Sequence, residues 1–283
     1  MTYFLLLLII ADQLLEAVMA KQYNIKAKHN NVLLFSGVCC FFALVFFLIN
    51  SGGKLDFNSA IVPYALAFAT AFGTATATAV FAIKTGPLSL TTLFSSYSLL
   101  IPTFYGILIL KDPISPTLYI GLAALLVSLF LINMKKNESL KFSPIWIVFV
   151  LLAFVSNGMC STIQKMQQLK FDGAYKNEFM IIALAVVVVV LIASGLMQKG
   201  SKAEMLKPCL KYGAVKGLGN VFLNFLVMVT SATLPNSVLF PSISAGGTVV
   251  TYLCSVFVYK EKLTKTQTIG YVLGIISIVF LNL

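Results

Sequence analysis

The feature that most constrains this chain is a series of ten apolar runs, each about 20 residues long, separated by short polar connections. A helix needs about 20 apolar residues to cross the hydrocarbon core of a bilayer. The chain is 59% hydrophobic and only 10% charged, whereas a soluble domain is about 25% charged. We therefore predict an all-α membrane protein of ten transmembrane helices, over residues 3–20, 32–49, 60–83, 88–110, 116–134, 144–164, 178–197, 209–230, 237–259 and 266–283.

The composition excludes several classes of function. The connections between the runs are too short to hold a nucleotide-binding motor or a catalytic domain in water. The chain has one histidine, His29, and its five cysteines lack the spacing of metal ligands. We expect no metal site and no cofactor. The first run holds Asp12 and Glu16 and has no lysine before it, unlike a signal peptide, so we expect it to stay in the mature protein.

The positive charge has an uneven distribution. The net charge of +11 comes from lysines, since the chain has no arginine, and these lie almost entirely in the connections. They are typical of topology signals rather than of a nucleic-acid patch, so we expect no nucleic-acid partner. Fourteen connection lysines lie on the side reached after the first run, which we call the lysine-rich face, and five lie on the opposite, lysine-poor face. The positive-inside rule then puts both termini outside the cell.

The chain also resembles itself. A shift of 149 residues lays Lys111-Asp112 on Lys260-Glu261, and a shift of 146 lays Leu93-Phe94 on Leu239-Phe240. This pattern predicts two five-helix repeats, residues 1–137 and 138–283. Because five is odd, the second repeat enters the membrane with opposite orientation, which gives inverted repeats typical of transporters. The alternative is chance alignment of apolar helices.

Short motifs of both repeats resemble a known family. Each repeat has a polar-interrupted first helix, a tight turn after the third, a Ser-rich fourth, and an acidic residue before the fifth, as in Lys111-Asp112-Pro113 and Lys260-Glu261-Lys262. These features resemble the drug/metabolite transporter superfamily, in its ten-helix EamA-like branch. The resemblance implies secondary transport of small organic solutes, often in exchange for protons, through a cavity between the repeats. It also implies that both termini lie in the cytoplasm, opposite to the lysine count.

The first repeat is similar to a small multidrug resistance subunit as well. Asp12 falls where that family carries a membrane-embedded acidic residue. This chain has Asp there instead of Glu, adds Glu16 one turn later, and has Ser156 and Asn157 at the matching place of the second repeat.

Three charged residues lie inside the predicted helices: two acidic residues are candidates for ion coupling, and one lysine is a candidate for solute binding. Asp12 and Glu16 are four residues apart and share one helix face, and an ionisable group near mid-membrane usually faces protein or a water-filled cavity. They are candidate proton acceptors or counter-ions for a cationic solute; the alternative is a structural carboxyl. Lys216 lies at a depth similar to that of Glu16, which predicts an ion pair. Lys216 would otherwise snorkel to the interface or meet an anionic solute.

Matching polar stripes on the third and eighth runs are candidates for the lining of a cavity. The aligned positions are Thr70, Thr74 and Thr78 with Lys216, Asn220 and Asn224. Hydroxyls and amides there could hydrogen-bond a solute. The alternative is helix packing, because Thr permits close approach and can bond its own backbone.

The fourth and ninth runs are rich in Ser and Thr and contain helix breakers. We predict gates or hinges at Pro102, Pro241, Gly246 and Gly247, with packing kinks as the alternative. Further solute contacts are predicted at Ser96, Tyr97, Ser156, Asn157, Ser242 and Tyr252. The two tyrosines would form an aromatic wall for a ring-bearing or cationic solute.

The sequence thus predicts a secondary transporter in the cell membrane that moves a small organic metabolite or drug-like solute by alternating access, with proton coupling left open. Its expected partners are the solute, the lipid bilayer and, where coupling operates, protons. A monomer is the default, and a dimer stays open. The alternative is a passive facilitator or channel. We expect no enzyme activity, because no nucleophile–base or metal grouping is evident.

Overall fold

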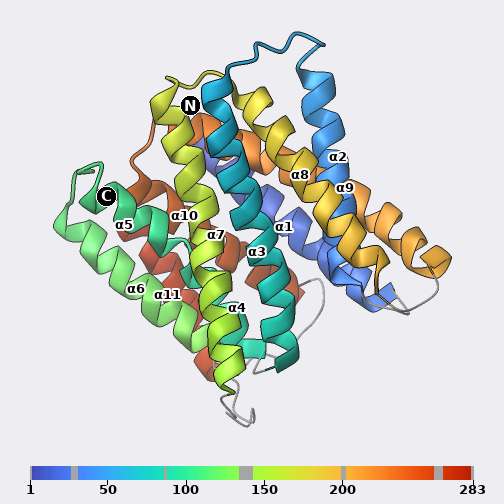
Figure 1. Cartoon of the computed structure of the whole chain (residues 1–283). Helices are drawn as coiled ribbons and strands as arrows, with labels where there is room; N and C mark the ends of the chain where they lie inside the picture. The colour runs from blue at the N-terminus through green and yellow to red at the C-terminus, as the bar shows by residue number, and fades with distance from the viewer. Residues whose placement is uncertain are drawn as a thin grey trace.

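The fold is described from a computed structural model that covers residues 2–26, 31–85, 88–133, 143–198, 202–257 and 264–281. Within these ranges the chain forms α-helices, one short 3-10 helix and no strand (Figure 1). The helices are α1 (Thr2–Lys26), α2 (Val32–Asn50), η1 (Ser59–Ile61), α3 (Val62–Thr85), α4 (Leu88–Tyr97), α5 (Leu100–Leu108), α6 (Pro116–Asn133), α7 (Pro144–Lys170), α8 (Lys176–Leu196), α9 (Lys202–Ser231), α10 (Asn236–Phe257) and α11 (Lys265–Leu281).

Each predicted apolar run is helical in the structure. Six helices in the described ranges are long and apolar enough to cross a membrane, and three shorter apolar segments lie within 94–108, 116–132 and 265–281. The all-α membrane fold is therefore confirmed. Three helices extend well beyond the predicted runs, at the end of α1, at the end of α7 and at the start of α9.

The fourth run differs from the prediction because it is broken into α4 and α5 at Ser98 and Leu99. Pro102 has no N–H to donate to the carbonyl four residues earlier, that of Ser98. That carbonyl instead accepts from the N–H of Ile101 at 3.1 Å, in a tighter turn. Pro241 causes no such break, since α10 continues through it from Asn236 to Phe257.

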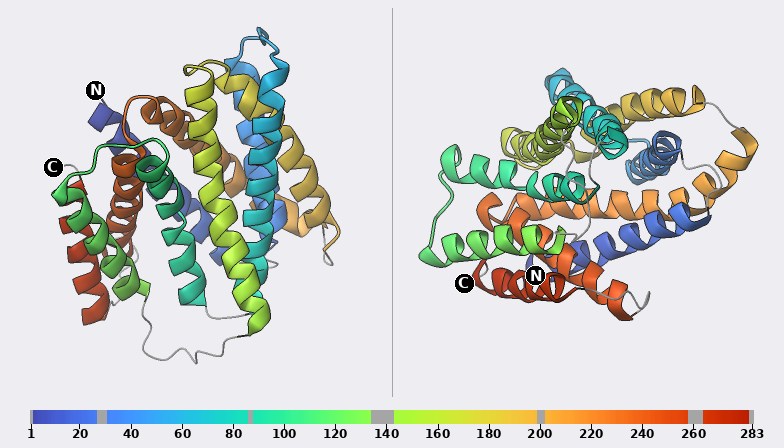
Figure 2. Two further views of the ribbon diagram at one scale, coloured as in Figure 1. Left: turned by 60° about the vertical axis from the view of Figure 1, so that its left-hand side comes forward. Right: turned by 90° about the horizontal axis from the view of Figure 1, so that it is seen from below.

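Helices from the two halves of the chain pack against each other. Paired helices include α1 with α9, α3 with α7, α2 with α8, α5 with α10, and α6 with α11, which lie side by side in Figure 2. If each half has five spans, with α4 and α5 together as the fourth, then α1, α2, α3, α5 and α6 correspond to α7, α8, α9, α10 and α11. Exchanging the corresponding helices turns the α1–α9 pair into the α7–α3 pair and leaves the other three pairs unchanged. Two related repeats require such a pattern. The predicted boundary at 137/138 lies outside the described residues and stays a prediction.

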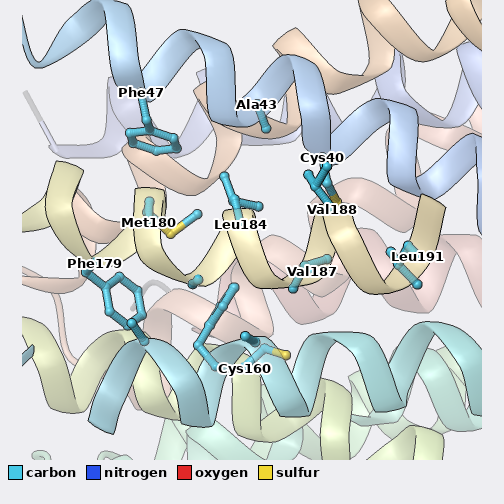
Figure 3. Close-up of a cluster of buried hydrophobic side chains, with 14 of the residues drawn as sticks. Cys40, Ala43, Phe47, Cys160, Phe179, Met180, Leu184, Val187, Val188 and Leu191 are labelled. Atoms are coloured by element: carbon cyan, nitrogen blue, oxygen red, sulfur yellow. The ribbon is translucent and has the colours of Figure 1, made fainter. Parts of the chain in front are cut away.

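The largest buried apolar cluster joins α2, α3, α7, α8 and α9. Phe47 and Ala43 of α2 face Met180 and Leu184 of α8, while Phe179 points to the opposite side (Figure 3). The outward faces are also apolar, and large side chains such as Leu7, Val189 and Met197 are exposed. A bundle that is apolar both inside and outside is suited to lipid rather than water.

Close contact between α2 and α8 depends on a glycine and gives a test of the packing. A Cβ placed at Gly195 would lie 2.7 Å from the Cα of Leu34, so Gly195→Ala must separate the two helices. We expect a loss of about 1–3 kcal/mol of stability, the usual cost of overpacking, measured as a lower unfolding temperature in detergent. Gly73→Ala is the control, because its Cβ would meet nothing within 4 Å; equal effects of the two variants would contradict this packing.

Candidate functional site

A cavity of about 600 Å³ lies within the bundle, between α1, α4, α6, α9, α10 and α11. The described residues that line it are Gln13, Glu16, Ala17, Ala20, Ser95, Ser96, Leu99, Leu129, Ile132, Lys216, Asn220, Leu223, Ser244, Gly247, Thr248 and Tyr271. The cavity extends toward the lysine-rich face, since Ile132 is one residue from the end of α6 there. Its inner end is apolar: Leu99 and Leu223 pack against a buried cluster that includes Ile10 and Phe240.

An ion pair lines the wall of the cavity. The Lys216 Nζ lies 3.4 Å from the Glu16 Oε2, and the two side chains keep 26% and 15% of their surface exposed. The amide of Asn220 donates to the other carboxylate oxygen of Glu16 at 3.3 Å. Among the three alternatives for Lys216, the structure therefore has the pair with Glu16. Both charges remain accessible from the cavity while compensating each other.

A chain of amides continues from this pair into the bundle. The Asn224 Nδ2 donates to the side-chain oxygen of Asn220 at 3.1 Å, and to its backbone carbonyl at 2.7 Å. The Gln164 Nε2 of α7 donates to the Asn224 Oδ1 at 2.7 Å. Asn224 does not line the cavity but joins Asn220, which does, to Gln164 of α7.

Asp12 lies apart from the cavity. Its side chain is 8% exposed, and a Cβ on Gly219 of α9 would lie 3.0 Å from its Oδ1. No described residue bonds its Oδ2. A buried carboxyl oxygen without a partner is costly when ionised. The surroundings of Asp12 therefore favour a carboxyl that carries a proton or that contacts a cation. Of the two predicted coupling residues, the structure brings only Glu16 into the cavity wall.

The predicted threonine stripe and one aromatic residue lie elsewhere. Thr78 is buried, and its hydroxyl donates to the carbonyl of Thr74 on the same helix at 2.6 Å. Thr74 is exposed and lines neither described cavity. The hydroxyl of Tyr97 donates to the Leu126 carbonyl at 2.6 Å. The hydroxyl of Thr78 is thus bonded within its own helix, as the packing alternative describes, and that of Tyr97 is bonded to a neighbouring helix.

Of the predicted solute-binding residues in the sixth and ninth runs, one lines a cavity and others do not. Asn157 donates to the Ser98 hydroxyl at 2.5 Å and lines a second cavity of about 180 Å³, which shares Ser95 with the first. Ser156 lines neither cavity, and Ser242 is fully buried. The side chain of Tyr252 lies outside the described residues.

The predicted hinge residues take part in close packing. Pro102 and Pro241 are buried. A Cβ at Gly246 would lie 2.7 Å from the Ile10 Cγ1, and one at Gly247 would lie 2.9 Å from the Gln13 Cδ. The two glycines thus let α10 approach α1 next to the cavity, and Gly247 also lines it.

Several lining residues were missed by the sequence reasoning. Gln13 neighbours Asp12 and turns to the cavity, while Ser244 and Thr248 are one helical turn apart on α10. The spacing of four between Ser244 and Thr248 was a usable signal. No comparable sequence signal marked Tyr271, since a single tyrosine in an apolar helix is also typical of an interfacial position.

The ion pair gives a second test. Removing one partner leaves the other charge inside the bundle, so Glu16→Gln and Lys216→Gln should each lower the unfolding temperature more than the double variant does. We expect a coupling energy on the order of 0.5–3 kcal/mol from a double-mutant cycle in detergent. Asp56→Asn, which neutralises an exposed carboxylate in the connection before α3, is the control. Additive effects would show that the two groups do not depend on each other.

Comparisons with known proteins agree with this architecture. The sequence profile of the EamA-like transporter family matches residues 144–283. None of the curated proteins matches the chain. A solved structure described only as "Crystal structure of protein" is similar over 99% of this chain and 95% of its own, with a TM-score of 0.75 and 11% identity. That likeness concerns the fold alone.

The family match agrees with the resemblance predicted from the motifs, without testing the ten-helix branch. EamA-like proteins are membrane transporters of small solutes, and the apolar helices mark a multi-pass membrane protein. The second half of the chain, residues 144–283, thus matches the EamA-like transporter family, which is consistent with the drug/metabolite transporter superfamily.

Proposed function

We propose that this protein is a secondary transporter that moves a small organic solute across the cell membrane by alternating access. The observation that carries the proposal is a cavity with an ion pair and further polar groups in its wall, inside a bundle with an apolar exterior. Its volume of about 600 Å³ is in the range of small-molecule sites.

The Glu16–Lys216 pair supplies the recognition chemistry in this proposal. A cationic group on the solute competes with Lys216 for the carboxylate, and an anionic group competes with Glu16 for the ammonium. Gln13, Asn220 and Thr248 offer amide and hydroxyl groups around the pair. Cationic, zwitterionic and aromatic solutes are the classes that this lining accepts.

Alternating access is supported by the helix pairs that stay equivalent when the two halves are exchanged. Inverted repeats can interchange their conformations, which moves the opening of a shared cavity from one face to the other. The cavity here extends toward the lysine-rich face, so the proposed cycle includes a second state with an opening at the lysine-poor face.

Proton coupling in this proposal uses two carboxyls with different surroundings. Glu16 is paired with Lys216, whereas the Asp12 Oδ2 is buried without a partner among the described residues. Asp12 is then the group that gains and loses the proton. The passive facilitator remains the second candidate, since the cavity itself would serve either mode.

Uptake into proteoliposomes tests the proposal. The probes are amino acids, aromatic cations and aromatic acids, each measured with and without an imposed pH gradient. We expect at least one solute to accumulate above its external concentration when the gradient is present. Asp12→Asn should abolish this accumulation yet leave exchange of labelled for unlabelled solute, because Asp12 lies outside the cavity.

Asp56→Asn is the matched control, since Asp56 is an exposed carboxylate in the connection before α3. Flux that only equilibrates, and does not respond to the gradient, would favour the facilitator. Normal accumulation by Asp12→Asn would remove Asp12 from the coupling mechanism.

A further inference from the structure

A second polar cluster lies at the lysine-poor face, and a lysine is at its centre. Lys165 is 6% exposed, although the sequence reasoning assigned it to a connection. It belongs to α7, and its Nζ donates to the backbone carbonyl of Ser231 at the end of α9. No described carboxylate lies within ion-pair distance of the Lys165 Nζ. The acidic residue that interacts with Lys165 electrostatically, at longer range, is Asp112.

Asp112 ties the same cluster to α10. Its Oδ2 accepts the backbone N–H of Ser237 at 3.1 Å, in the first turn of α10. Helix α5 lies directly alongside, because a Cβ at Gly106 would lie 2.7 Å from the Asn236 Cβ and 3.2 Å from the Asp112 Cγ. The ends of α5, α7 and α9 and the start of α10 therefore meet here without space between them.

Several polar atoms in this cluster have no partner among the described residues. They are both amide atoms of Asn236 and the hydroxyl of Ser237. Both side chains are fully buried. Unpartnered buried polar groups are costly, and the cost disappears if water enters. The packed arrangement is therefore opposed by its own polar atoms and held by the bonds of Lys165 and Asp112.

The position of the cluster is opposite to that of the cavity. The cavity extends toward the lysine-rich face, and its inner end is closed by the apolar cluster around Ile10 and Phe240. Lys165, Asp112 and Ser237 lie at helix ends on the other face. A solute in the cavity would have to pass the helix ends that these residues join in order to leave by that face.

We propose that Lys165, Asp112 and the first turn of α10 form the closed gate of the transport pathway at the lysine-poor face, with Lys165 as the positioning residue that holds α7 against the end of α9. This proposal rests on the proposed transport function. Opening separates Lys165 from Ser231 and Asp112 from Ser237, and lets water reach Asn236 and Ser237. Loss of the Lys165 ammonium shifts the protein toward the open form.

Thiol labelling of the full chain in lipid nanodiscs tests the gate. The five native cysteines are replaced by alanine, and Ser237→Cys places a thiol at a fully buried position of the gate. We expect this thiol to react slowly with a charged maleimide, and Lys165→Met to raise the rate about tenfold or more, as loss of a charge-assisted bond implies. Asp112→Asn should raise it in the same direction, and Lys165→Arg should restore slow labelling.

Two controls separate gate opening from general loosening. Lys170→Met removes an exposed lysine from the end of the same helix and should leave the labelling rate unchanged. A protein that keeps only Cys40, buried between α2 and α8, should stay equally slow with and without Lys165→Met. A parallel rise at Cys40 would assign Lys165 to stability alone and overturn the gate.

Uptake of the same solute panel distinguishes failure of the gate from failure of the transporter. If the protein accumulates a solute but Lys165→Met labels at the Lys170→Met rate, the gate proposal is wrong and the transport function stands. If Lys165→Met raises the labelling rate but the protein transports none of the solutes under any condition, the cluster opens without serving a transport pathway, and both proposals are wrong. Normal uptake by the protein together with raised labelling in Lys165→Met supports the gate.

Discussion

The structure depends on one constraint: a polar group inside the bilayer must find its partner in the protein, because lipid offers none. Large apolar side chains therefore face outward, and Glu16, Lys216 and Lys165 each have a partner in the protein. Glu16 has both Lys216 and Asn220. Lys165 has the free carbonyl at the end of α9, a group that a helix terminus leaves without an intrahelical donor. Such partners fix how α1, α7 and α9 pack.

The positions of the membrane-spanning segments were predictable, because the bilayer itself sets the length and apolarity of each helix, whereas the extended ends of α1, α7 and α9 were not. The Glu16–Lys216 contact was also predictable, since two opposite charges at one depth have few other partners. Lys165 was not. The run Gln164-Lys165-Met166-Gln167-Gln168 has the polarity of a connection, yet α7 continues to Lys170 and buries both Lys165 and Gln167. That burial depends on Ser231 and Ala174, which accept from these side chains and cannot be located by periodicity.

The two aligned polar stripes differ because their side chains have different capacities. A threonine hydroxyl is short enough to satisfy itself on its own helix, as Thr78 does on the Thr74 carbonyl. An asparagine amide has two donors and an acceptor. Asn224 bonds its own helix through Nδ2 and still accepts from Gln164 through Oδ1. Periodicity placed both stripes on a face, but among the described contacts the stripe of Lys216, Asn220 and Asn224 is the one that reaches other helices.

Consecutive residues of α7 join the two polar clusters. Gln164 bonds Asn224, which belongs to the amide chain that ends at Glu16 in the cavity wall, and Lys165 bonds the carbonyl of Ser231 at the helix end. Asn224 and Ser231 are both on α9, about two helical turns apart. Helices α7 and α9 are thus tied at two depths. A tilt of α7 that breaks the bond at Ser231 also changes the geometry at Asn224, so the polar contacts of the cavity and those of the lysine-poor face cannot rearrange independently.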